Sequence, residues 1–524
     1  MPLPADLLPL ILDHLASDRA ALYQCLLADG QLHKAAAGLL YAQVLVKPKY
    51  GQTNGILDRL ESSSLPKYAP YVHTLSIQGL LLPNIVSAVP VSETLLTAIR
   101  AFANLQTLEV VPDIHPDDYF TAILQYALEL PSLNTLRVNS SCMSESDCRI
   151  LLQSTKLRRL ELKSPTRAVL NVLPEWLGRL TGLKELHLTS NCGSVTPGVL
   201  RSLVPLLQNI SAVSIGLSYS LTDDDLFDFL GQLGSLQSAH LQHYPQFKPM
   251  ENTAQMHNLR SLTVLHNLID DADAMARFCT WIHHAVAGAP IQRIKLCCDE
   301  FEESSFAPRS FDALLRDLAA YHGETLRALD LGGWLVSADA VTALFESCLG
   351  IEEFSAALDK PGFEEFERRT TMLQHLHTAA LRIYAGDVGT SLSDSERIMR
   401  QSVALRRLSL DEMRTEGAWV SRDGEVVFVV RELENLVEDA EEPSEDEGDA
   451  ASDDGSTRLL DSDDDDVERR PRLPYGIIMG AILEEDENGE YVLNDEGPII
   501  PMEAIEEETE PEESSSLGVQ PQIN

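Results

Sequence analysis

The stretch Leu183-Lys184-Glu185-Leu186-His187-Leu188-Thr189-Ser190-Asn191-Cys192 decides how the rest of the chain is interpreted. Leu183, Leu186 and Leu188 are spaced so that a short strand and the bend before it direct apolar side chains to one side. Asn191 follows where the chain should turn, and we expect its amide to satisfy buried backbone groups there. One such unit cannot bury its own apolar face, so copies of it must stack at a regular interval.

The same pattern, with apolar residues at the first, fourth and sixth positions, recurs along most of the chain. Its thirteen copies begin at Val72, Leu105, Leu133, Leu157, Leu183, Ile210, Leu236, Leu259, Ile291, Leu326, Ile351, Thr378 and Leu405. The copy at Thr378 is the weakest and is identified by Leu381 and Ile383. The mean step between copies is about 28 residues, within the range of leucine-rich repeats.

Segments with helical periodicity separate the expected strands. Apolar residues recur every three or four positions in 119–130, 197–207, 224–233, 311–321 and 338–349. Strand and helix therefore alternate. The sequence predicts an α/β leucine-rich-repeat solenoid, a horseshoe of stacked coils spanning residues 72–416.

The negative charge of the chain is concentrated at its end. The formal net charge is -41 at pH 7. Residues 438–524 contain 30 acidic residues and four arginines, a net of -26, which leaves -15 for the preceding 437 residues. Such a segment cannot bury enough apolar surface to offset its ordering entropy, so we expect a disordered acidic tail. The overall acidity also argues against nucleic acid as a partner.

Cysteine usage and hydropathy indicate an intracellular protein. The eight cysteines are irregularly spaced, unlike a disulfide framework, which favours a reducing compartment. No apolar run is long enough to span a membrane, and Asp6 and Asp13 interrupt the N-terminal apolar positions, unlike a secretory signal. We expect the protein in the cytoplasm, the nucleus or both, with no membrane partner.

Residues 1–46 differ from the repeats and are expected to form three short helices that lead into the strand-like Val44-Leu45-Val46. The apolar residues of the first two helices recur at helical spacing. They are Leu3, Leu7, Leu8, Ile11, Leu12, Leu15, Leu22 and Leu26, with Pro4 in the first turn. Three helices of this size cannot form a self-sufficient core, so part of their apolar surface should contact something else.

This N-terminal segment resembles the F-box of fungal proteins that join an F-box to leucine-rich repeats. The resemblance rests on Leu3-Pro4-x-x-Leu7-Leu8-x-x-Ile11-Leu12-x-x-Leu15, on Leu22-x-x-Cys25-Leu26 and on Ala35-Ala36-x-x-Leu39-Leu40-Tyr41-x-x-Val44. Where the family often has Val-Cys-Arg-x-Trp, this chain has Ala28-Asp29-Gly30-Gln31-Leu32. In that family the F-box binds the Skp adaptor of the SCF ubiquitin ligase, and through it the cullin, while the repeats hold the substrate.

The resemblance implies an adaptor-binding role for a set of N-terminal residues. They are Leu3, Pro4, Leu7, Leu8, Ile11, Leu12, Leu15, Leu22 and Leu26. A second interpretation is that residues 1–46 only cover the open end of the solenoid, as terminal repeats require. Residues 47–71 form either a linker or an incomplete first repeat.

The repeats contain no recognisable catalytic motif. We find no phosphate-binding glycine loop, no Gly-x-Ser-x-Gly elbow and no kinase signature. Cys279, His283, His284, Cys297 and Cys298 have metal-binding atoms, but their spacing is not that of a known site, so a buried structural role is favoured. We expect a protein that is not an enzyme and holds no metal or cofactor.

Binding is expected on the concave strand face that points away from the helices, because side chains alternate along a strand. The substrate-binding residues predicted there are Arg137, Arg159, Lys163, His187, His240, Arg293, Lys295, Arg382 and Arg407, beside the acidic Glu109, Glu161, Glu185 and Asp330. Arginines would bind an acidic or phosphorylated segment of a protein substrate through bidentate hydrogen bonds. An ordinary solvated strand face explains the pattern equally well.

Residues 417–437 are expected to form a β-hairpin that turns at Asp423-Gly424 and caps the far edge of the solenoid. The boundary with the tail falls near Val437. Within the tail, an apolar island at 473–493 should fold across Asn488-Gly489 or dock on the solenoid. The tail's acidic residues could cover the basic concave residues and compete with substrate.

These patterns predict the substrate-recognition subunit of an SCF-type E3 ubiquitin ligase, in which catalysis comes from the bound ligase parts and this chain contributes proximity. Two alternatives stay open. One is an acidic-tailed chaperone for basic proteins, similar to the acidic nuclear phosphoproteins with leucine-rich repeats. The other is a scaffold with no ligase role.

Overall fold

The computed structural model describes residues 7–15, 18–47, 60–80, 91–114, 118–244, 255–269, 271–298, 311–384, 391–402, 404–422, 425–433, 483–485 and 491–493. The chain divides into two compact units, Met1–Glu438 and Asp439–Asn524. Most of the predicted acidic tail, including most of its apolar island, lies outside the described residues, as does the middle of the segment 47–71.

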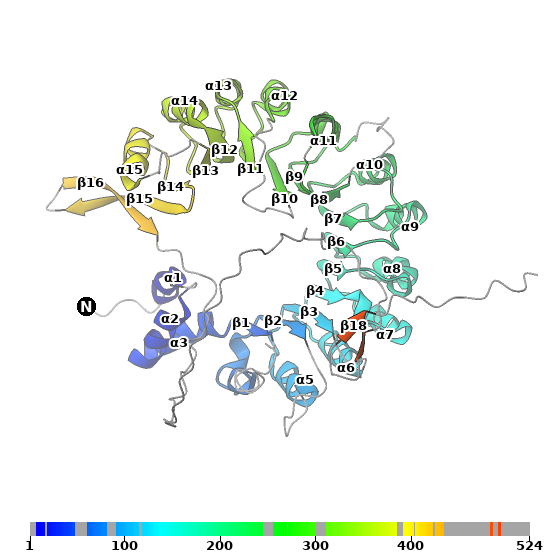
Figure 1. The fold of residues 1–524 in the computed structure, drawn as a ribbon. Helices are drawn as coiled ribbons and strands as arrows, with labels where there is room; N and C mark the ends of the chain where they lie inside the picture. Colours follow the sequence, from blue (N-terminus) through cyan, green and yellow to red (C-terminus); the bar gives the residue numbers. More distant parts are fainter. Residues whose placement is uncertain are drawn as a thin grey trace, which may run out of the picture. The chain divides into compact units, whose positions relative to one another are not determined.

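A mixed α/β fold with one sheet of 16 strands makes up the first unit, and the strands follow one another in sequence order (Figure 1). Neighbours are parallel from β1 to β14 and antiparallel from β14 to β16. The strands are β1 Gln43–Val46, β2 Thr74–Leu80, β3 Thr107–Ile114, β4 Thr135–Asn139, β5 Arg159–Lys163, β6 Glu185–Asn191, β7 Ala212–Leu217, β8 Ser238–His243, β9 Ser261–His266, β10 Arg293–Cys298, β11 Ala328–Val336, β12 Glu353–Asp359, β13 Thr378–Tyr384, β14 Arg407–Leu410, β15 Met413–Arg422 and β16 Glu425–Leu433.

Three helices precede the sheet, and the helices between its parallel strands lie along one side of it (Figure 1). The α-helices are α1 Leu8–Asp13, α2 Arg19–Ala28, α3 Gly30–Leu40, α5 Val91–Ala101, α6 Asp118–Ala127, α7 Glu145–Ile150, α8 Arg167–Arg179, α9 Pro197–Leu203, α10 Asp223–Gly231, α11 Ala272–Val286, α12 Asp312–His322, α13 Ala338–Ser347, α14 Lys360–Thr370 and α15 Leu392–Gln401. Short 3-10 helices are η2 Ala69–Tyr71, η3 Ser140–Cys142, η4 Leu151–Gln153 and η5 Val204–Leu206.

Each repeat strand buries alternate residues toward the helices. In β6, Leu186 and Leu188 are 1% and 0% exposed, whereas His187 lies on the other face. Leu186 is in register with Leu160 of β5 and Val213 of β7. Because equivalent apolar residues stay in register from strand to strand, they form one continuous hydrophobic core, which is the packing that stacked repeats require.

The thirteen strands expected from the repeat pattern are present as β2 to β14. β1 adds one more parallel strand, since Val44 and Val46 are in register with Leu75 and Ile77 of β2. The strand-like segment at the end of the N-terminal helices therefore belongs to the sheet. The whole is a long, mostly parallel sheet of the solenoid type.

The expectation that Asn191 satisfies buried backbone groups is wrong. The side chain is exposed, and its Oδ1 accepts a hydrogen bond from the backbone N–H of Gly193 at 3.0 Å, within the same turn. In another coil, a buried asparagine does satisfy a backbone group. Asn139 Nδ2 donates to the backbone carbonyl of Pro112, in the neighbouring coil, at 2.8 Å.

The three N-terminal helices have a small core of their own. It contains Leu12, Leu22, Leu26, Ala36, Ala37 and Tyr68. The Asp18 side chain caps α2, and the Asp29 side chain caps α3 by accepting hydrogen bonds from the first turn of each helix. Asp29 also ends α2, so the segment in which the F-box resemblance breaks down contains the bend between these helices and the first turn of α3.

The predicted β-hairpin is formed by β15 and β16. Arg422 lies opposite Glu425, so only Asp423-Gly424 joins the strands. β15 pairs in addition with β14, and Phe428 and Val430 of β16 are buried in the repeat core. The hairpin extends the sheet by two strands and makes β16 its last one.

The second unit contributes a short antiparallel pair, β17 Leu483–Glu485 and β18 Tyr491–Leu493, in which Leu483 lies opposite Leu493. The connection between them, including Asn488-Gly489, lies outside the described residues. Among the described helices of the chain, none combines the length and the apolar character needed to cross a membrane.

Candidate functional site

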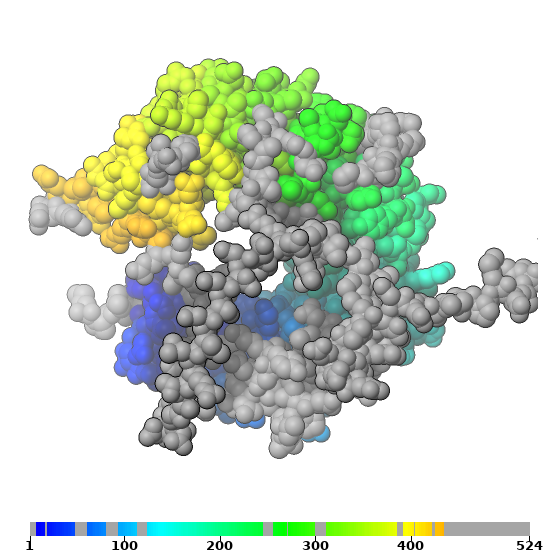
Figure 2. All heavy atoms as spheres, viewed as in Figure 1, coloured from blue at the N-terminus to red at the C-terminus, as the bar shows by residue number. Residues whose placement is uncertain are grey.

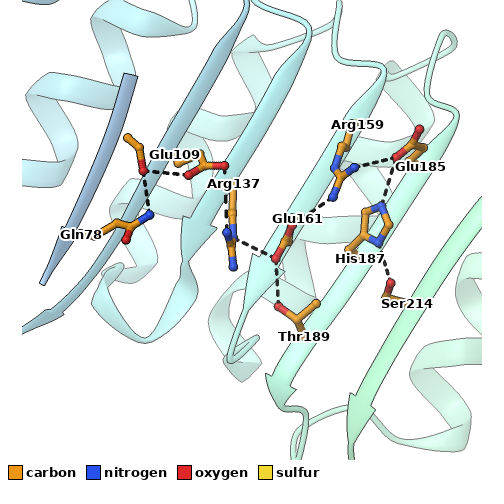
Figure 3. Close-up of polar contacts among 10 residues, drawn as sticks. Gln78, Glu109, Arg137, Arg159, Glu161, Glu185, His187, Thr189 and Ser214 are labelled. Carbon is orange, nitrogen blue, oxygen red and sulfur yellow. Dashed lines mark hydrogen bonds and ion pairs between the residues drawn. The ribbon is translucent and has the colours of Figure 1, made fainter. Parts of the chain in front are cut away.

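A row of polar side chains crosses the sheet on the face opposite the helices (Figure 3). The third positions of β2 to β7 carry, in register, Ser76, Glu109, Arg137, Glu161, His187 and Ser214. Arg159 and Glu185 stand beside them at the first positions of β5 and β6. Parallel neighbours are about 4.8 Å apart, so opposite charges in register meet. We call Glu109, Arg137, Arg159, Glu161, Glu185 and His187 the ion-pair ladder.

Glu161 is the centre of the ion-pair ladder. Its Oε1 lies 2.9 Å from Arg137 Nε, an ion pair without hydrogen-bond alignment, and its Oε2 lies 3.6 Å from Arg159 Nη2. Thr189 Oγ1 donates a hydrogen bond to Glu161 Oε1 at 3.4 Å. The Glu161 side chain is only 10% exposed, so its charge depends on these partners for compensation.

The ladder continues in both directions from this centre. On one side, Arg137 Nη1 lies 4.0 Å from Glu109 Oε1, and Ser76 Oγ donates to Glu109 Oε2 at 2.8 Å. On the other side, Arg159 Nη1 donates to Glu185 Oε2 at 3.1 Å. Each cation therefore lies between two carboxylates.

His187 ends the ladder. Burial, helped by Arg159, lowers the pKa of His187 below its usual value, so the ring is neutral at pH 7. Its Nε2 lies 3.3 Å from Glu185 Oε2 and its Nδ1 lies 2.6 Å from Ser214 Oγ. A carboxylate only accepts, so Nε2 carries the proton and Nδ1 accepts from the Ser214 hydroxyl.

The remaining predicted residues of this face lie farther along the sheet, except Lys163 in β5. Cross-strand ion pairs join Arg293 to Glu353 at 3.2 Å, Lys295 to Asp330 at 3.6 Å and Arg407 to Glu416 at 3.8 Å. Lys163, His240 and Arg382 lie on the same face of β5, β8 and β13. The face is therefore a surface of alternating charge, in which Arg137, Arg159, His187, Arg293, Lys295 and Arg407 have acidic partners within the sheet.

Two exposed tyrosines that come just after neighbouring strands of the sheet were not identified from the sequence. Tyr219 and Tyr244 follow β7 and β8, are 69% and 38% exposed, and their rings pack edge to face at 4.9 Å. Exposed tyrosine pairs are typical of protein interfaces. Their signal in the sequence is a tyrosine three or four residues after the last buried aliphatic residue of neighbouring strands, Ile215 and Leu241.

The apolar residues of α1 divide between two sides of the helix. Leu8 and Leu12 are 6% and 3% exposed and pack inward. Leu7, Leu10 and Ile11 are 44%, 66% and 45% exposed. Figure 2 shows the atoms of α1 to α3, in dark blue, at the surface of the molecule. We call Leu7, Leu10 and Ile11 the α1 apolar stripe.

The second helix is divided in the same way. Leu22 and Leu26 are buried, whereas Tyr23 and Leu27 are 52% and 62% exposed. Of the other predicted adaptor-binding residues, Leu15 is half-buried against the small core. Leu3 and Pro4 lie outside the described residues. Leu10, Tyr23 and Leu27 were missed because sequence reasoning assigned each helix a single apolar face.

A cavity of about 520 Å³ lies where these helices meet the sheet. Its lining includes Arg19 and Tyr23 of α2, Tyr41 after α3 and Val44 of β1. The Tyr41 ring stacks on Tyr68 at 4.3 Å. This stack joins the end of α3 to the segment that leads into β2.

The cysteine and histidine group of α11 and β10 is not arranged as a metal centre. In the described part of the chain, no set of three or more His, Cys, Asp or Glu side chains could hold a metal ion. Cys279 and His283 instead line a cavity of about 480 Å³ between α11 and α12. Burial raises the pKa of the Cys279 thiol to about 12, so the thiol is unreactive at pH 7.

Comparison with known proteins gives little to add to this description. No protein-family model matches the sequence, and no curated protein matches it either. Among solved structures, the chain is similar to one in the crystal structure of the Rad7 and Elc1 complex in yeast, with a TM-score of 0.34 and 14% sequence identity. That match covers 75% of this chain and 94% of the other.

Proposed function

We propose that this chain is the substrate-recognition subunit of an SCF-type E3 ubiquitin ligase. In this proposal α1 and α2 bind the Skp adaptor, which links the chain to the cullin. The strand face opposite the helices binds a protein substrate. The chain performs no catalysis itself, and its contribution is to hold the substrate near the ubiquitin-transferring subunits.

The observation that carries the proposal is the exposure of the α1 apolar stripe. Leu8 and Leu12, on the other side of α1, already attach the helix to the protein. Leu7, Leu10 and Ile11 therefore add little to folding while they remain in water, and they favour contact with another protein. The helices that carry them have a core separate from that of the repeats, as a docking module requires.

The charges of the strand face favour a substrate of mixed charge over a purely acidic one. An acidic segment would have to compete with Glu109, Glu161 and Glu185 for their arginines. A segment with both signs can exchange these pairs without leaving a buried charge alone. Tyr219 and Tyr244, which follow β7 and β8 of the same sheet, offer exposed aromatic contact area.

Binding of purified Skp adaptor tests the proposal. The intact protein should bind, and Leu7→Asp/Ile11→Asp should abolish binding because it places two charges on the α1 apolar stripe. Leu206→Asp/Leu349→Asp is the matched control, since both leucines are exposed, at 39% and 51%, on the repeats. Circular dichroism should show the same helix and strand content for all three proteins.

Absence of binding by the intact protein would refute the ligase proposal and leave α1 to α3 as a cover for the first strand of the sheet. Equal loss of adaptor binding by the control Leu206→Asp/Leu349→Asp would show that the loss is not specific to the α1 apolar stripe. The chaperone alternative is supported by the net charge of -26 in residues 438–524. It requires that this segment alone bind histones with steep salt dependence, whereas adaptor binding should survive its deletion.

A further inference from the structure

The last strand of the sheet has an open edge. β16 pairs with β15 on one side, and no described strand pairs with its other side. Successive residues of an antiparallel strand alternately direct their N–H and C=O groups to either edge, so half of those of β16 point away from β15. Val426 and Val427 are 68% and 40% exposed, and no proline interrupts the strand. Such an edge is a template for a further strand.

Charges of alternating sign lie in register across the last strands of the sheet, and the alternation stops at the open edge of β16. Arg407, Glu416 and Arg431 lie in register on β14, β15 and β16, with Arg407 Nε 3.8 Å from Glu416 Oε1. At the other end of the hairpin, Arg422 of β15 is in register with Glu425 of β16. Glu425 and Arg431 of β16 belong to the same face of the sheet, because they are separated by an even number of positions. One row ends in a cation and the other in an anion.

The sequence of β16 is symmetric about Phe428. It reads Glu425-Val426-Val427-Phe428-Val429-Val430-Arg431. If two such strands pair in antiparallel fashion with Phe428 opposite Phe428, Val427 lies opposite Val429 and Val426 lies opposite Val430. Glu425 of each strand then meets Arg431 of the other. Both charge series continue across the junction with the correct alternation.

We propose that β16 pairs edge to edge with β16 of a second copy of this chain, in the antiparallel register centred on Phe428. A two-fold axis at Phe428 makes the contact self-complementary and closed, so two copies complete it. The contact is formed by backbone hydrogen bonds, valine pairs and two Glu425–Arg431 pairs. Exposed Trp419, 56% accessible on β15, lies beside Phe428 at 5.0 Å between ring centroids and adds apolar surface.

The self-complementary charges favour a second copy over an unrelated peptide. An unrelated strand could use the same backbone groups, but only a strand with an anion and a cation at opposite ends of five apolar residues satisfies both Glu425 and Arg431. The strand itself is such a sequence. The inference does not involve α1 to α3, so it stands or falls apart from the proposed ligase role.

Sedimentation velocity of the full chain tests the inference through charge reversal. The intact protein should show a concentration-dependent dimer. Glu425→Arg places arginine opposite Arg431 twice, and Arg431→Glu places glutamate opposite Glu425 twice. Each single variant should dimerise roughly tenfold or more weakly, because two favourable pairs become repulsive. Both residues are exposed, so circular dichroism should show an unchanged fold.

Mixing the two single variants tests the proposed register. A chain with arginine at 425 and 431 meets a chain with glutamate at both positions, so the register predicts a mixed dimer stronger than either variant alone. The pairing should weaken as salt is added. A chain that stays monomeric at every concentration, or a dimer that neither reversal weakens, would overturn the proposal. A mixture that fails to restore the dimer would overturn the register.

Discussion

His243 and His266 lie in register at the ends of β8 and β9 and are 9% and 0% exposed. Their rings flank Phe278 at 4.7 and 4.8 Å. Trp334 Nε1 donates to His266 Nε2 at 3.3 Å, so the His266 proton is on Nδ1, which donates to the Asn267 carbonyl at 2.8 Å. His243 Nδ1 is buried and has no hydrogen-bond partner among the described residues.

This environment makes the stability of the protein depend on pH. Burial, together with His266, lowers the pKa of His243 to about 4 from 6.5. Below pH 6.5 the His243 ring binds a proton in the unfolded chain but stays neutral in the folded chain until about pH 4. The free energy of unfolding therefore falls between pH 6.5 and 4, by roughly 3 kcal/mol for this residue. Urea unfolding across this range should show a shallower pH slope for His243→Gln. A pH slope in His243→Gln equal to that of the intact protein would contradict the assignment.

The residues of the ion-pair ladder could be identified from the sequence, but the pairing of their opposite charges could not. Arg137 and Glu161 are 24 positions apart, and each looks like an exposed charge until the register of β4 and β5 places them together. Leu7 and Leu8 show that the same limit on prediction from the sequence applies to a helix. They are adjacent apolar residues, and only the packing of α1 decides that one is exposed and the other buried.

At the level of elements, β6 and β7 illustrate how closely two coils approach. Their register shifts between Leu188 and Asn191, where Ser190 adopts a φ of 61°. A Cβ at Gly216 would lie 2.4 Å from the carbonyl oxygen of Ser190. The two backbones are in close contact at this point, and glycine fits there because it has no Cβ.

Gly216→Ala should therefore destabilise the protein by about 1–3 kcal/mol, because the added methyl group forces the two backbones apart. Gly182→Ala, in the turn that leads into β6, is the matched control. A Cβ there meets nothing within 4 Å, and the expected effect lies between no change and about 1 kcal/mol of stabilisation. Urea denaturation of both variants measures the difference, and similar midpoints would contradict the contact.

The repeat strands could be predicted because the pattern is local. Each needs only three apolar residues within six positions, and all thirteen were found, as was the hairpin at Asp423-Gly424. The membership of β1 could not be settled in this way, because the first position of the pattern before Val44 and Val46 is Tyr41, an aromatic residue with a polar hydroxyl in place of an aliphatic one. Its place depends on pairing with β2, about 30 residues later.

At the scale of the whole molecule, each strand pairs only with its neighbours in the sequence. The stability of such an array is a sum of coil terms and nearest-neighbour terms. Two core substitutions should therefore interact when their coils touch and act independently when they do not.

A pair of double-mutant cycles checks this expectation. Leu186→Ala and Val213→Ala affect residues in register on β6 and β7 and should show a coupling of about 0.5–3 kcal/mol. Leu108→Ala and Leu381→Ala affect β3 and β13, and their effects should add within about 0.5 kcal/mol. Comparable coupling in the two cycles, measured by urea unfolding, would show that the sheet does not behave as a nearest-neighbour array.

The register that the equivalent buried residues keep between parallel strands also bears on how the gene can change. Equivalent buried residues are 23 positions apart between Ala239 and Leu262 but 35 apart between Ile294 and Leu329, and both steps keep the strands paired. Insertions and deletions of coding sequence are thus absorbed between strands, and a whole coil could be duplicated or lost in the interior of the parallel region. The hairpin after β14 reverses the chain, so this route to a longer or shorter protein ends there.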